Sequence, residues 1–181
     1  SGAGGNLMLV KDGKSCSPVY GWQTSYDPAI TEKVLAPLSK EAVYNTVGWP
    51  KLDSFPLSAL GYLKATDPQA LDNADMVCMH IEYLNYKLTG AWGITRSQGT
   101  TFYLIDQAAG KYSKEHLDVL GLTEDKLPPI VDACSILGTV TAEAAEKTGL
   151  DVGTPVSPGT FDHPSAARGA GVFDESNVMV S

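Results

Sequence analysis

The chain has 181 residues, of which 43% are hydrophobic and 19% charged, as in an ordinary globular protein with one core or two small ones. Its formal net charge of −8 and its pI of about 4.7 argue against nucleic acid or an anionic membrane as a partner. No apolar run approaches the roughly 20 residues of a membrane span, the three histidines show no metal-ligand spacing, and the three widely spaced cysteines predict buried free thiols in a reducing cytoplasm.

Helices alternate with short apolar strands along the chain, which indicates an α/β fold. In chain order we predict strands over 6–10 and 18–22 around a turn at 11–14, and helices over 28–46, 55–64, 75–88 and 113–121. Pro37 interrupts the first of these helices. The helix over 75–88 has Asp75 as its expected N-cap and Gly90 as its stop. Its apolar stripe consists of Val77, Ile81, Leu84 and Leu88.

The segment 138–171 is the most informative part of the chain. It predicts a strand, a helix capped by Thr141, a second short strand and a further helix packed with small residues. Pro164 suits the first position of that last helix, so that His163 is its cap and Asp162 lies one residue ahead of the cap. Asp162 is therefore expected at a strand-to-helix corner, where α/β folds usually keep their chemistry.

Asp162 is the leading catalytic candidate. A carboxylate beside a helix N-terminus is stabilised as the anion, and it can accept the proton of a hydroxyl that attacks a phosphoryl group. The alternative is a structural cap or turn residue, which is the commoner outcome of this pattern. The small residues that follow favour a functional role, because they let a ligand or other backbone approach closely.

Three other side chains could bind a sugar or polyol. Trp22 could stack on the apolar face of a sugar, with packing in the core as the alternative. Gln98 and His163 could donate hydrogen bonds to a polyol, with simple solvation as the alternative. The glycine-rich run at 2–5 is neither a phosphate loop nor a dinucleotide fingerprint, since no Gly-Lys-Ser/Thr follows it, and we find no ATP-binding loop in this chain.

Several spaced motifs, in this order, resemble the FGGY carbohydrate kinases, a family that includes pentulose kinases, gluconokinase and glycerol kinase. The matching stretches are S-G-A-G-G-N-L-M-L-V-K-D-G-K at 1–14, V-Y-G-W at 19–22, I-E-Y-L-N-Y-K-L-T-G at 81–90, S-Q-G-T-T-F-Y-L-I-D at 97–106, and G-T-V-T-A-E-A-A-E-K-T-G-L with D-H-P-S-A-A-R-G-A-G in the last third. The stretches in the last third form the most specific match.

The resemblance implies ATP-dependent phosphorylation of a sugar or polyol hydroxyl. A pentulose such as xylulose is the favoured acceptor, with gluconate, glycerol or another ketose as alternatives. It also implies two actin-like, ribonuclease-H-like domains. Residues 1–175 would form most of the N-terminal, sugar-binding domain, and 176–181 would begin the first strand of the ATP-binding domain, so that the domain fold is incomplete at both ends. ATP and Mg²⁺ would bind largely through loops outside this chain.

The resemblance also assigns roles to single residues. Asp162 falls on the family's catalytic base, Trp22 on a sugar-site aromatic and His163 on a substrate-contacting position, and Gln98 is our fourth candidate for the site. The chain departs from the family pattern around the sugar. Trp22-Gln23-Thr24-Ser25-Tyr26 replaces Trp-x-Asp-x-Arg, Thr95 replaces a frequent aspartate, and Thr160-Phe161 replaces Gly-Gly before the base. These changes affect the acceptor more than the reaction type.

A reading from a different functional class is a stand-alone, non-catalytic module for sugar binding or oligomerisation. For the kinase we expect a cytoplasmic location, and a homodimer is a further possibility. Sugar binding without nucleotide binding by this chain would fit both a kinase fragment and a binding module.

Overall fold

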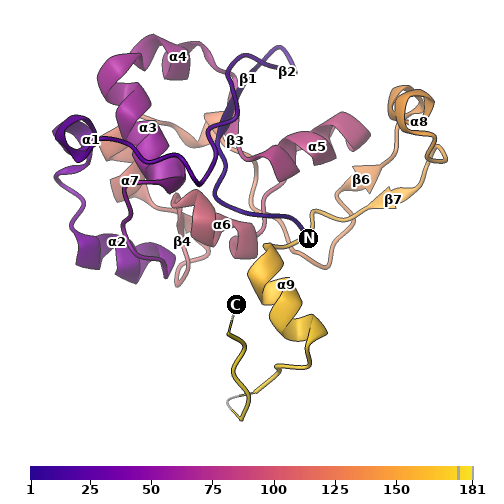
Figure 1. Cartoon of the computed structure of the whole chain (residues 1–181). Helices are drawn as coiled ribbons and strands as arrows, with labels where there is room; N and C mark the ends of the chain where they lie inside the picture. Colours follow the sequence, from indigo (N-terminus) through magenta and orange to yellow (C-terminus); the bar gives the residue numbers. More distant parts are fainter. Residues whose placement is uncertain (175, 181) are drawn as a thin grey trace.

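The computed structural model describes residues 1–174 and 176–180 and confirms a mixed α/β architecture (Figure 1). A three-stranded sheet of order β2-β1-β3 is formed by Met8–Lys11 (β1), Lys14–Ser15 (β2) and Met76–Cys78 (β3). Both pairings are antiparallel, with Val10 opposite Ser15 and Leu9 opposite Val77. A strand from the start of the chain is thereby fixed next to one that follows some 65 residues later.

Helices surround this sheet on both sides. To its left in Figure 1 lie α1 (Pro28–Leu35), α2 (Lys40–Val47), α3 (Phe55–Thr66), α4 (Pro68–Asn73) and α7 (Lys114–Leu120). To its right lie α5 (His80–Thr89), α8 (Ala142–Thr148) and the antiparallel pair of β6 (Gly138–Thr139) and β7 (Pro155–Val156). The remaining elements are α6 (Arg96–Phe102), β4 (Ile105–Asp106), β5 (Lys111–Tyr112), the 3₁₀ turn Glu124–Lys126 and α9 (Asp162–Gly169).

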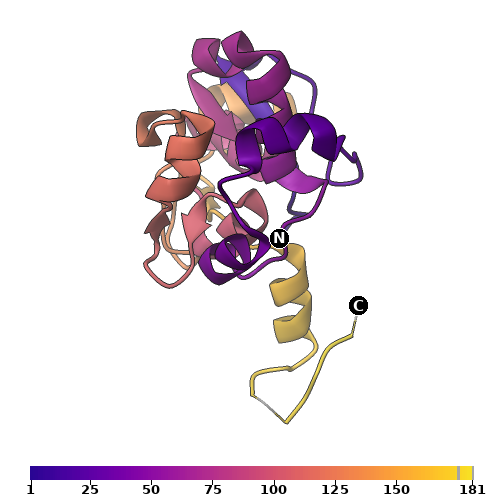
Figure 2. The same cartoon turned by 90° about the vertical axis from the view of Figure 1, so that its left-hand side faces the viewer.

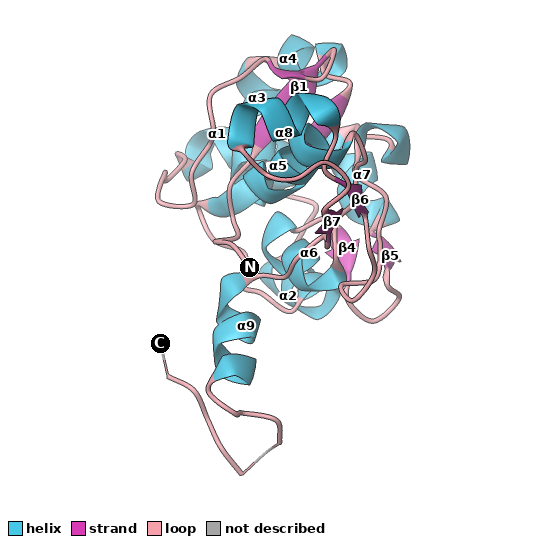
Figure 3. Ribbon diagram, turned by 90° about the vertical axis from the view of Figure 1, so that its right-hand side faces the viewer, coloured by secondary structure: helices cyan, strands magenta, loops and turns pink. Residues whose placement is uncertain are grey.

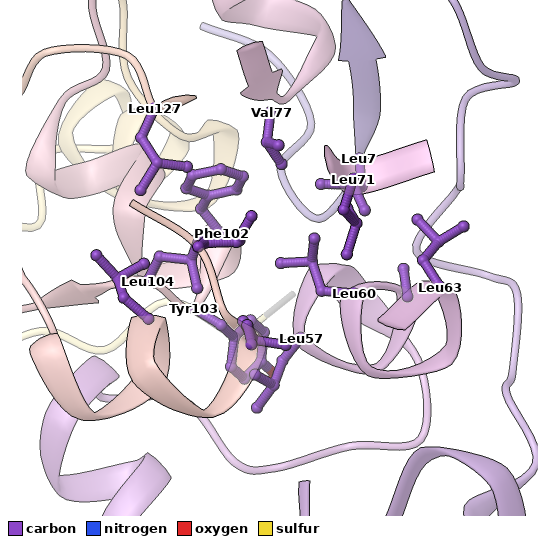
Figure 4. Packing of buried hydrophobic residues seen from close by; sticks show 14 of the residues in the cluster. Leu7, Leu57, Leu60, Leu63, Leu71, Val77, Phe102, Tyr103, Leu104 and Leu127 are labelled. Carbon is purple, nitrogen blue, oxygen red and sulfur yellow. The ribbon is translucent and has the colours of Figure 1, made fainter. Parts of the chain in front are cut away.

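The hydrophobic core is centred on α3, which is buried along most of its length. Leu57 and Leu60 face the apolar run that follows α6, where Tyr103 is fully buried (Figure 4). One turn after Leu57, at Gly61, the backbone of α3 approaches α1. A Cβ atom added at Gly61 would lie only 2.7 Å from Cγ of Leu35, so glycine permits the close packing of these two helices.

The predicted hairpin at the start of the chain is confirmed. Asp12 and Gly13 both have positive φ, 50° and 68°, as a two-residue type I′ turn requires. The strand predicted over 18–22 is wrong, because only Tyr20 pairs there, in an isolated antiparallel bridge with Leu7. The helix predicted over 28–46 is divided after Leu35 into α1 and α2, as the interruption by proline indicated. The helices predicted over 55–64 and 113–121 are confirmed as α3 and α7.

The first turn of the helix predicted over 75–88 is wrong. Its first residues form β3, because β1 offers them a sheet partner that the local sequence does not reveal. Asp75 is consequently not a helix cap. Its carboxylate accepts hydrogen bonds from Lys11 Nζ at 2.6 Å and from Asp12 N at 2.8 Å, and so closes the β1–β2 turn against the chain before β3.

The apolar stripe predicted for the same helix is also wrong. In α5, Leu84 is 57% exposed. The side chains that the helix buries are instead polar, Glu82 and Asn85. The expected stop is confirmed, since Gly90 ends α5 in the left-handed conformation with φ of 76°.

The last third of the chain follows the predicted order of strand, helix, strand and helix. Thr141 caps α8 as expected, with Oγ1 accepting from Ala144 N at 3.2 Å. The last helix, α9, projects away from the body of the molecule, with the N-terminus of the chain beside its first turn (Figures 2 and 3). Residues 176–180 form no strand in this structure, and the proposed boundary at 175 and the end at 181 lie outside the described residues. Their assignment to a second domain stays a prediction.

The cysteines are all free, as predicted, but only Cys78 is buried, whereas Cys16 and Cys134 are exposed. Over the residues that the structure describes, no helix is long and apolar enough to cross a membrane. Within the same residues no group of three His, Cys, Asp or Glu side chains is placed to hold a metal ion.

Candidate active site

Asp162 lies at the corner between β7 and α9, which we call the β7–α9 corner and define as residues 157–162. The helix begins at Asp162 itself, with Phe161 as N-cap, so the expected cap at His163 is wrong by two residues. Asp162 Oδ1 accepts a hydrogen bond from His163 N at 2.9 Å. The carboxylate therefore lies in the first turn of α9, where helix N–H groups favour a negative charge.

The N-terminal segment of the chain fixes this corner from the other side. Gly2 pairs with Phe161 in a parallel bridge, in which Asp162 N donates to Gly2 O at 3.1 Å and Gly2 N donates to Thr160 O at 3.3 Å. In addition, Phe161 N donates to Ser97 Oγ at 3.3 Å. The backbone on both sides of the carboxylate is thus hydrogen-bonded to segments far away in the sequence.

The carboxylate faces a pocket of about 320 Å³. The residues that line it are Ala3, Gly4, Trp22, Trp49, Phe55, Phe161, Asp162 and His163. Three of the four predicted site residues therefore meet around one cavity, although about 140 residues separate Trp22 from the other two. The side chain of Asp162 is only partly buried, so it is not fully enclosed by its neighbours.

Aromatic rings form the walls of the pocket. The ring centroids of Trp49 lie 6.3 Å from those of both Phe55 and Phe161, the second pair meeting edge to face at 85°. Trp22 lies 6.4 Å from Phe55 and is 44% exposed, which rules out the alternative of a core tryptophan. His163 stacks on Phe161 with 5.2 Å between ring centroids. Such walls suit the C–H faces of a sugar ring or chain.

Gln98, the fourth candidate, is not among the residues that line this pocket. It is fully buried and forms a capping box at the start of α6, where its Oε1 accepts from Thr95 N at 2.8 Å and from Thr95 Oγ1 at 2.9 Å. Its Nε2 donates to Pro158 O at 3.3 Å. Thr95, the departure from a frequent aspartate, is likewise buried in this cap and does not line the pocket.

Sequence reasoning missed Trp49 and Phe55, because neither lies in a recognisable motif. Phe55 has a φ of 69°, an unusual conformation for a bulky side chain that costs on the order of 1–3 kcal/mol. The glycine run at 2–5 could have pointed to these rings. Sequence analysis showed only that the run is no phosphate loop and gave it no other role. A Cβ atom at Gly4 would lie 2.9 Å from the ring of Phe161, and one at Gly5 would lie 2.5 Å from the ring of Phe55. The glycines therefore make room for the aromatic walls.

The arrangement combines one carboxylate and one imidazole with a largely apolar wall. Among the lining residues only Asp162 can accept a proton as a carboxylate. A substrate whose hydroxyl lies against Asp162 while its carbon skeleton contacts the rings would meet both requirements of the site. A polyol or sugar has this combination of groups.

The chain is similar to known proteins over nearly its whole length. The N-terminal domain of the "FGGY family of carbohydrate kinases" matches residues 2–169. The chain is 35% identical over 173 residues to an L-xylulose/3-keto-L-gulonate kinase of Escherichia coli (strain K12), a match that covers 94% of this chain and 32% of that protein. It is 28% identical over 174 residues to an L-fuculokinase of Salmonella typhi, covering 96% of this chain and 37% of that protein.

Solved structures give the same result for the fold. Xylulose kinase from Rhodospirillum rubrum superposes with a TM-score of 0.84 at 26% identity, over 93% of this chain and 35% of that one. Ligand-bound xylulose kinase from Lactobacillus acidophilus has a TM-score of 0.85 at 19% identity, over 94% and 35% of the two chains. The predicted actin-like ATPase fold is thereby confirmed. The chain spans about a third of the length of the relatives that it matches.

Proposed function

The chain belongs to the FGGY family of carbohydrate kinases and carries its N-terminal domain, and from this premise we propose that its protein transfers the γ-phosphoryl group of ATP to a hydroxyl group of a sugar or polyol. A pentulose such as xylulose is the acceptor we favour. The observation that carries the proposal is the convergence of Trp22, Asp162 and His163 on one pocket lined by aromatic rings.

In this proposal Asp162 is the general base. Its carboxylate takes the proton of the acceptor hydroxyl as that oxygen becomes bonded to phosphorus, and a positioned base of this kind contributes about 10²- to 10⁴-fold to the rate. The position in the first turn of α9 supports the role, because it places Asp162 among the residues that line the pocket. Asp162 Oδ1 accepts a hydrogen bond from His163 N, and the two oxygens of a carboxylate together can accept further hydrogen bonds, for example from a substrate hydroxyl.

Trp22 and its neighbours would hold the carbon skeleton of the acceptor. The rings of Trp22, Trp49 and Phe55 line the same cavity as the carboxylate, so a substrate in contact with them has its hydroxyl groups near Asp162. We propose that His163 contacts a second hydroxyl of the acceptor. Gln98 is not part of this proposal, because its amide is already used in the cap of α6 and at Pro158.

ATP and Mg²⁺ are the phosphoryl donor and the metal ion that membership of the family implies. The residues described here do not fit a metal site, since they contain no group of three candidate ligands and the pocket offers one carboxylate. We therefore assign no Mg²⁺ ligand in this chain and no step through the ion. Our proposal is that the nucleotide and metal bind largely to other segments of the full-length protein, in which residues after 175 begin the ATP-binding domain.

The acceptor sugar, the cellular location and the oligomeric state are also proposed for the full-length protein. Relatives named for L-xylulose favour a pentulose, whereas those named for L-fuculose keep another ketose as the alternative. A cytoplasmic location fits a consumer of ATP and the free cysteines of the chain. A homodimer remains a prediction.

The proposal is tested by the variant Asp162→Asn in the full-length protein, with xylulose and Mg·ATP as substrates. We expect kcat to fall by about 10²- to 10⁴-fold, with the thermal midpoint of unfolding within a few degrees of the parent protein. Asp27→Asn is the matched control, because Asp27 also accepts one helix N–H group at 2.9 Å but does not line the pocket. Near-normal turnover by Asp162→Asn would refute the assignment of the base. Sugar binding without any turnover by the parent protein would favour a non-catalytic module.

A further inference from the structure

Buried polar side chains from two other helices hold the backbone that leads into Asp162. Pro158 O, within the β7–α9 corner, accepts two amide N–H groups, from Asn85 Nδ2 at 3.0 Å and from Gln98 Nε2 at 3.3 Å. The next carbonyl along the chain, that of Gly159, accepts from Thr95 Oγ1 at 3.3 Å. The three donors lie 60 to 73 residues earlier in the sequence than the carbonyls that they bind, so none of these bonds follows from local structure.

Two of these donors have a local reason to be where they are, because Gln98 and Thr95 form the capping box of α6. Asn85 has no such reason. It lies in the middle of α5, where it is only 7% exposed, and its side-chain amide donates to Pro158 O. An apolar side chain would pack in this place without the cost of removing an amide from water, which is on the order of 1–3 kcal/mol when the amide is left unpaired. A buried amide at this position therefore serves geometry more than stability.

The hydrogen bond from Asn85 lies where it can influence the position of the Asp162 carboxylate. The far end of the β7–α9 corner is fixed by the pairing of Gly2 with Phe161, and the near end by the amides on Pro158 O. Gly159 between them has a φ of 80°, which gives the backbone freedom to rotate once either end is released. With the amide of Asn85 removed, Pro158 O keeps only the longer bond from Gln98.

We propose that Asn85 is a positioning residue for Asp162, an inference that rests on the proposed kinase function. Asn85 holds the carbonyl of Pro158, this carbonyl sets the path of the β7–α9 corner, and the corner sets the distance between the carboxylate and the acceptor hydroxyl. Asn85 is not among the residues that line the pocket. Its loss is therefore expected to affect the chemical step and to leave acceptor binding to the aromatic walls nearly unchanged.

The test measures kcat and KM separately for Asn85→Leu in the full-length protein, with xylulose as the variable substrate. We expect kcat to fall about 10- to 100-fold, since a displacement of about 1 Å at a reacting group can cost 10²-fold, while KM for the sugar changes less than about threefold. Tyr112→Phe is the matched control. Tyr112 is also buried and donates to a proline carbonyl, Pro128 O at 2.6 Å, but this carbonyl lies outside the β7–α9 corner, so loss of this hydrogen bond should leave kcat unchanged.

A double variant separates positioning from general destabilisation. If Asn85 acts through Asp162, then adding Asn85→Leu to Asp162→Asn should lower kcat by less than about twofold further. Hydrogen exchange gives a second readout without turnover: the amides of Phe161 and Asp162, which donate to Ser97 Oγ and Gly2 O, should exchange faster in Asn85→Leu and at the parent rate in Tyr112→Phe. Should Asn85→Leu fail to fold, Asn85→Ser, whose hydroxyl is too short to reach Pro158 O, is judged by the same measurements.

Three results would overturn the inference: an unchanged kcat in the Asn85 variant, an equal loss of kcat in Tyr112→Phe, or full additivity in the double variant. Failure of the proposed function has a different signature, because Asp162→Asn would then leave turnover unchanged. If turnover is lost in Asp162→Asn but not in Asn85→Leu, only the positioning role of Asn85 is refuted.

Discussion

The buried carboxyl group of Glu82 gives the structure a predictable dependence of stability on pH. The side chain is fully enclosed at the start of α5. Its Oε2 accepts a hydrogen bond from Met79 N at 2.9 Å, whereas its Oε1 has no hydrogen-bond partner within the described residues. Burial raises the pKa of Glu82 from 4.5 to about 7, because desolvation of the charged form outweighs the two backbone N–H bonds that favour it.

A raised pKa means that the folded chain holds this proton more tightly than the unfolded chain does. Below pH 4.5 the group is protonated in both states, and its contribution to stability is fully present. As the pH rises from 4.5 to about 7 the unfolded chain releases the proton first, so the free energy of unfolding falls. Each pKa unit corresponds to about 1.4 kcal/mol, which gives a loss of about 3 kcal/mol across this interval.

The variant Glu82→Gln isolates this effect, since the amide resembles the protonated acid and does not titrate. Urea unfolding of parent and variant at pH 4.5 and pH 8 should show that Glu82→Gln gains about 3 kcal/mol relative to the parent at the higher pH. His80 and His116 have pKa values that are lowered by burial, so their contributions to stability change with pH in the opposite direction. These contributions are the same in parent and variant, and they cancel when the two free energies of unfolding are subtracted. Glu143→Gln is the control, because its ion pair with Lys147 lowers the pKa of Glu143 and gives the opposite sign. Parallel pH curves for parent and Glu82→Gln would refute the reasoning.

Two further variants test the packing and the pocket. Gly61→Ala should destabilise the fold by about 1–2 kcal/mol in urea unfolding despite the better helix propensity of alanine, because the new Cβ would press on Leu35. Gly169→Ala is the control and should be neutral or stabilising, since nothing lies within 4 Å of the added Cβ. A larger loss of stability in Gly169→Ala than in Gly61→Ala would contradict the packing argument. Trp22→Ala in the full-length protein should raise KM for the sugar about 10-fold with little change in kcat, since one aromatic contact is worth about 0.5–1.5 kcal/mol. Tyr44 is an exposed aromatic residue outside the pocket, so Tyr44→Ala should change neither KM nor kcat. An unchanged KM in Trp22→Ala would show that the Trp22 ring does not contact the sugar.

The features that sequence reasoning predicted correctly are those with local causes. Asp12-Gly13 specifies a type I′ turn by itself, and Gly90 ends α5 by its own conformation. The first turn of the predicted helix over 75–88 failed for the opposite reason. Its residues form β3 only because β1 lies beside them, and that pairing joins segments that no local window contains.

The same distinction explains what was found of the site. Asp162 and His163 were recognisable because a strand-to-helix corner followed by small residues is a local pattern. Trp22 was recognisable as an aromatic side chain that could stack on a sugar, and the resemblance to a family supported it. Trp49 and Phe55 reach the pocket through the packing of α3 and of the loop before it, which no motif records. Gln98 was assigned to the substrate because a polar side chain in a polar run gives no sign that it will be buried in a helix cap.

The buried face of α5 connects these observations into one account of how the fold supports its site. A helix chosen for stability alone would turn Leu84 inward, yet α5 exposes this leucine and buries Glu82 and Asn85. Glu82 closes the start of the helix at a cost that grows with pH, and Asn85 reaches across to the backbone before Asp162. In our proposal, α5 gives up some apolar burial so that Asn85 can hold the backbone that leads into Asp162. Apolar patterns could not predict this helix face, because its buried residues are polar: Glu82 accepts from the backbone at the start of the helix, and Asn85 donates to the β7–α9 corner.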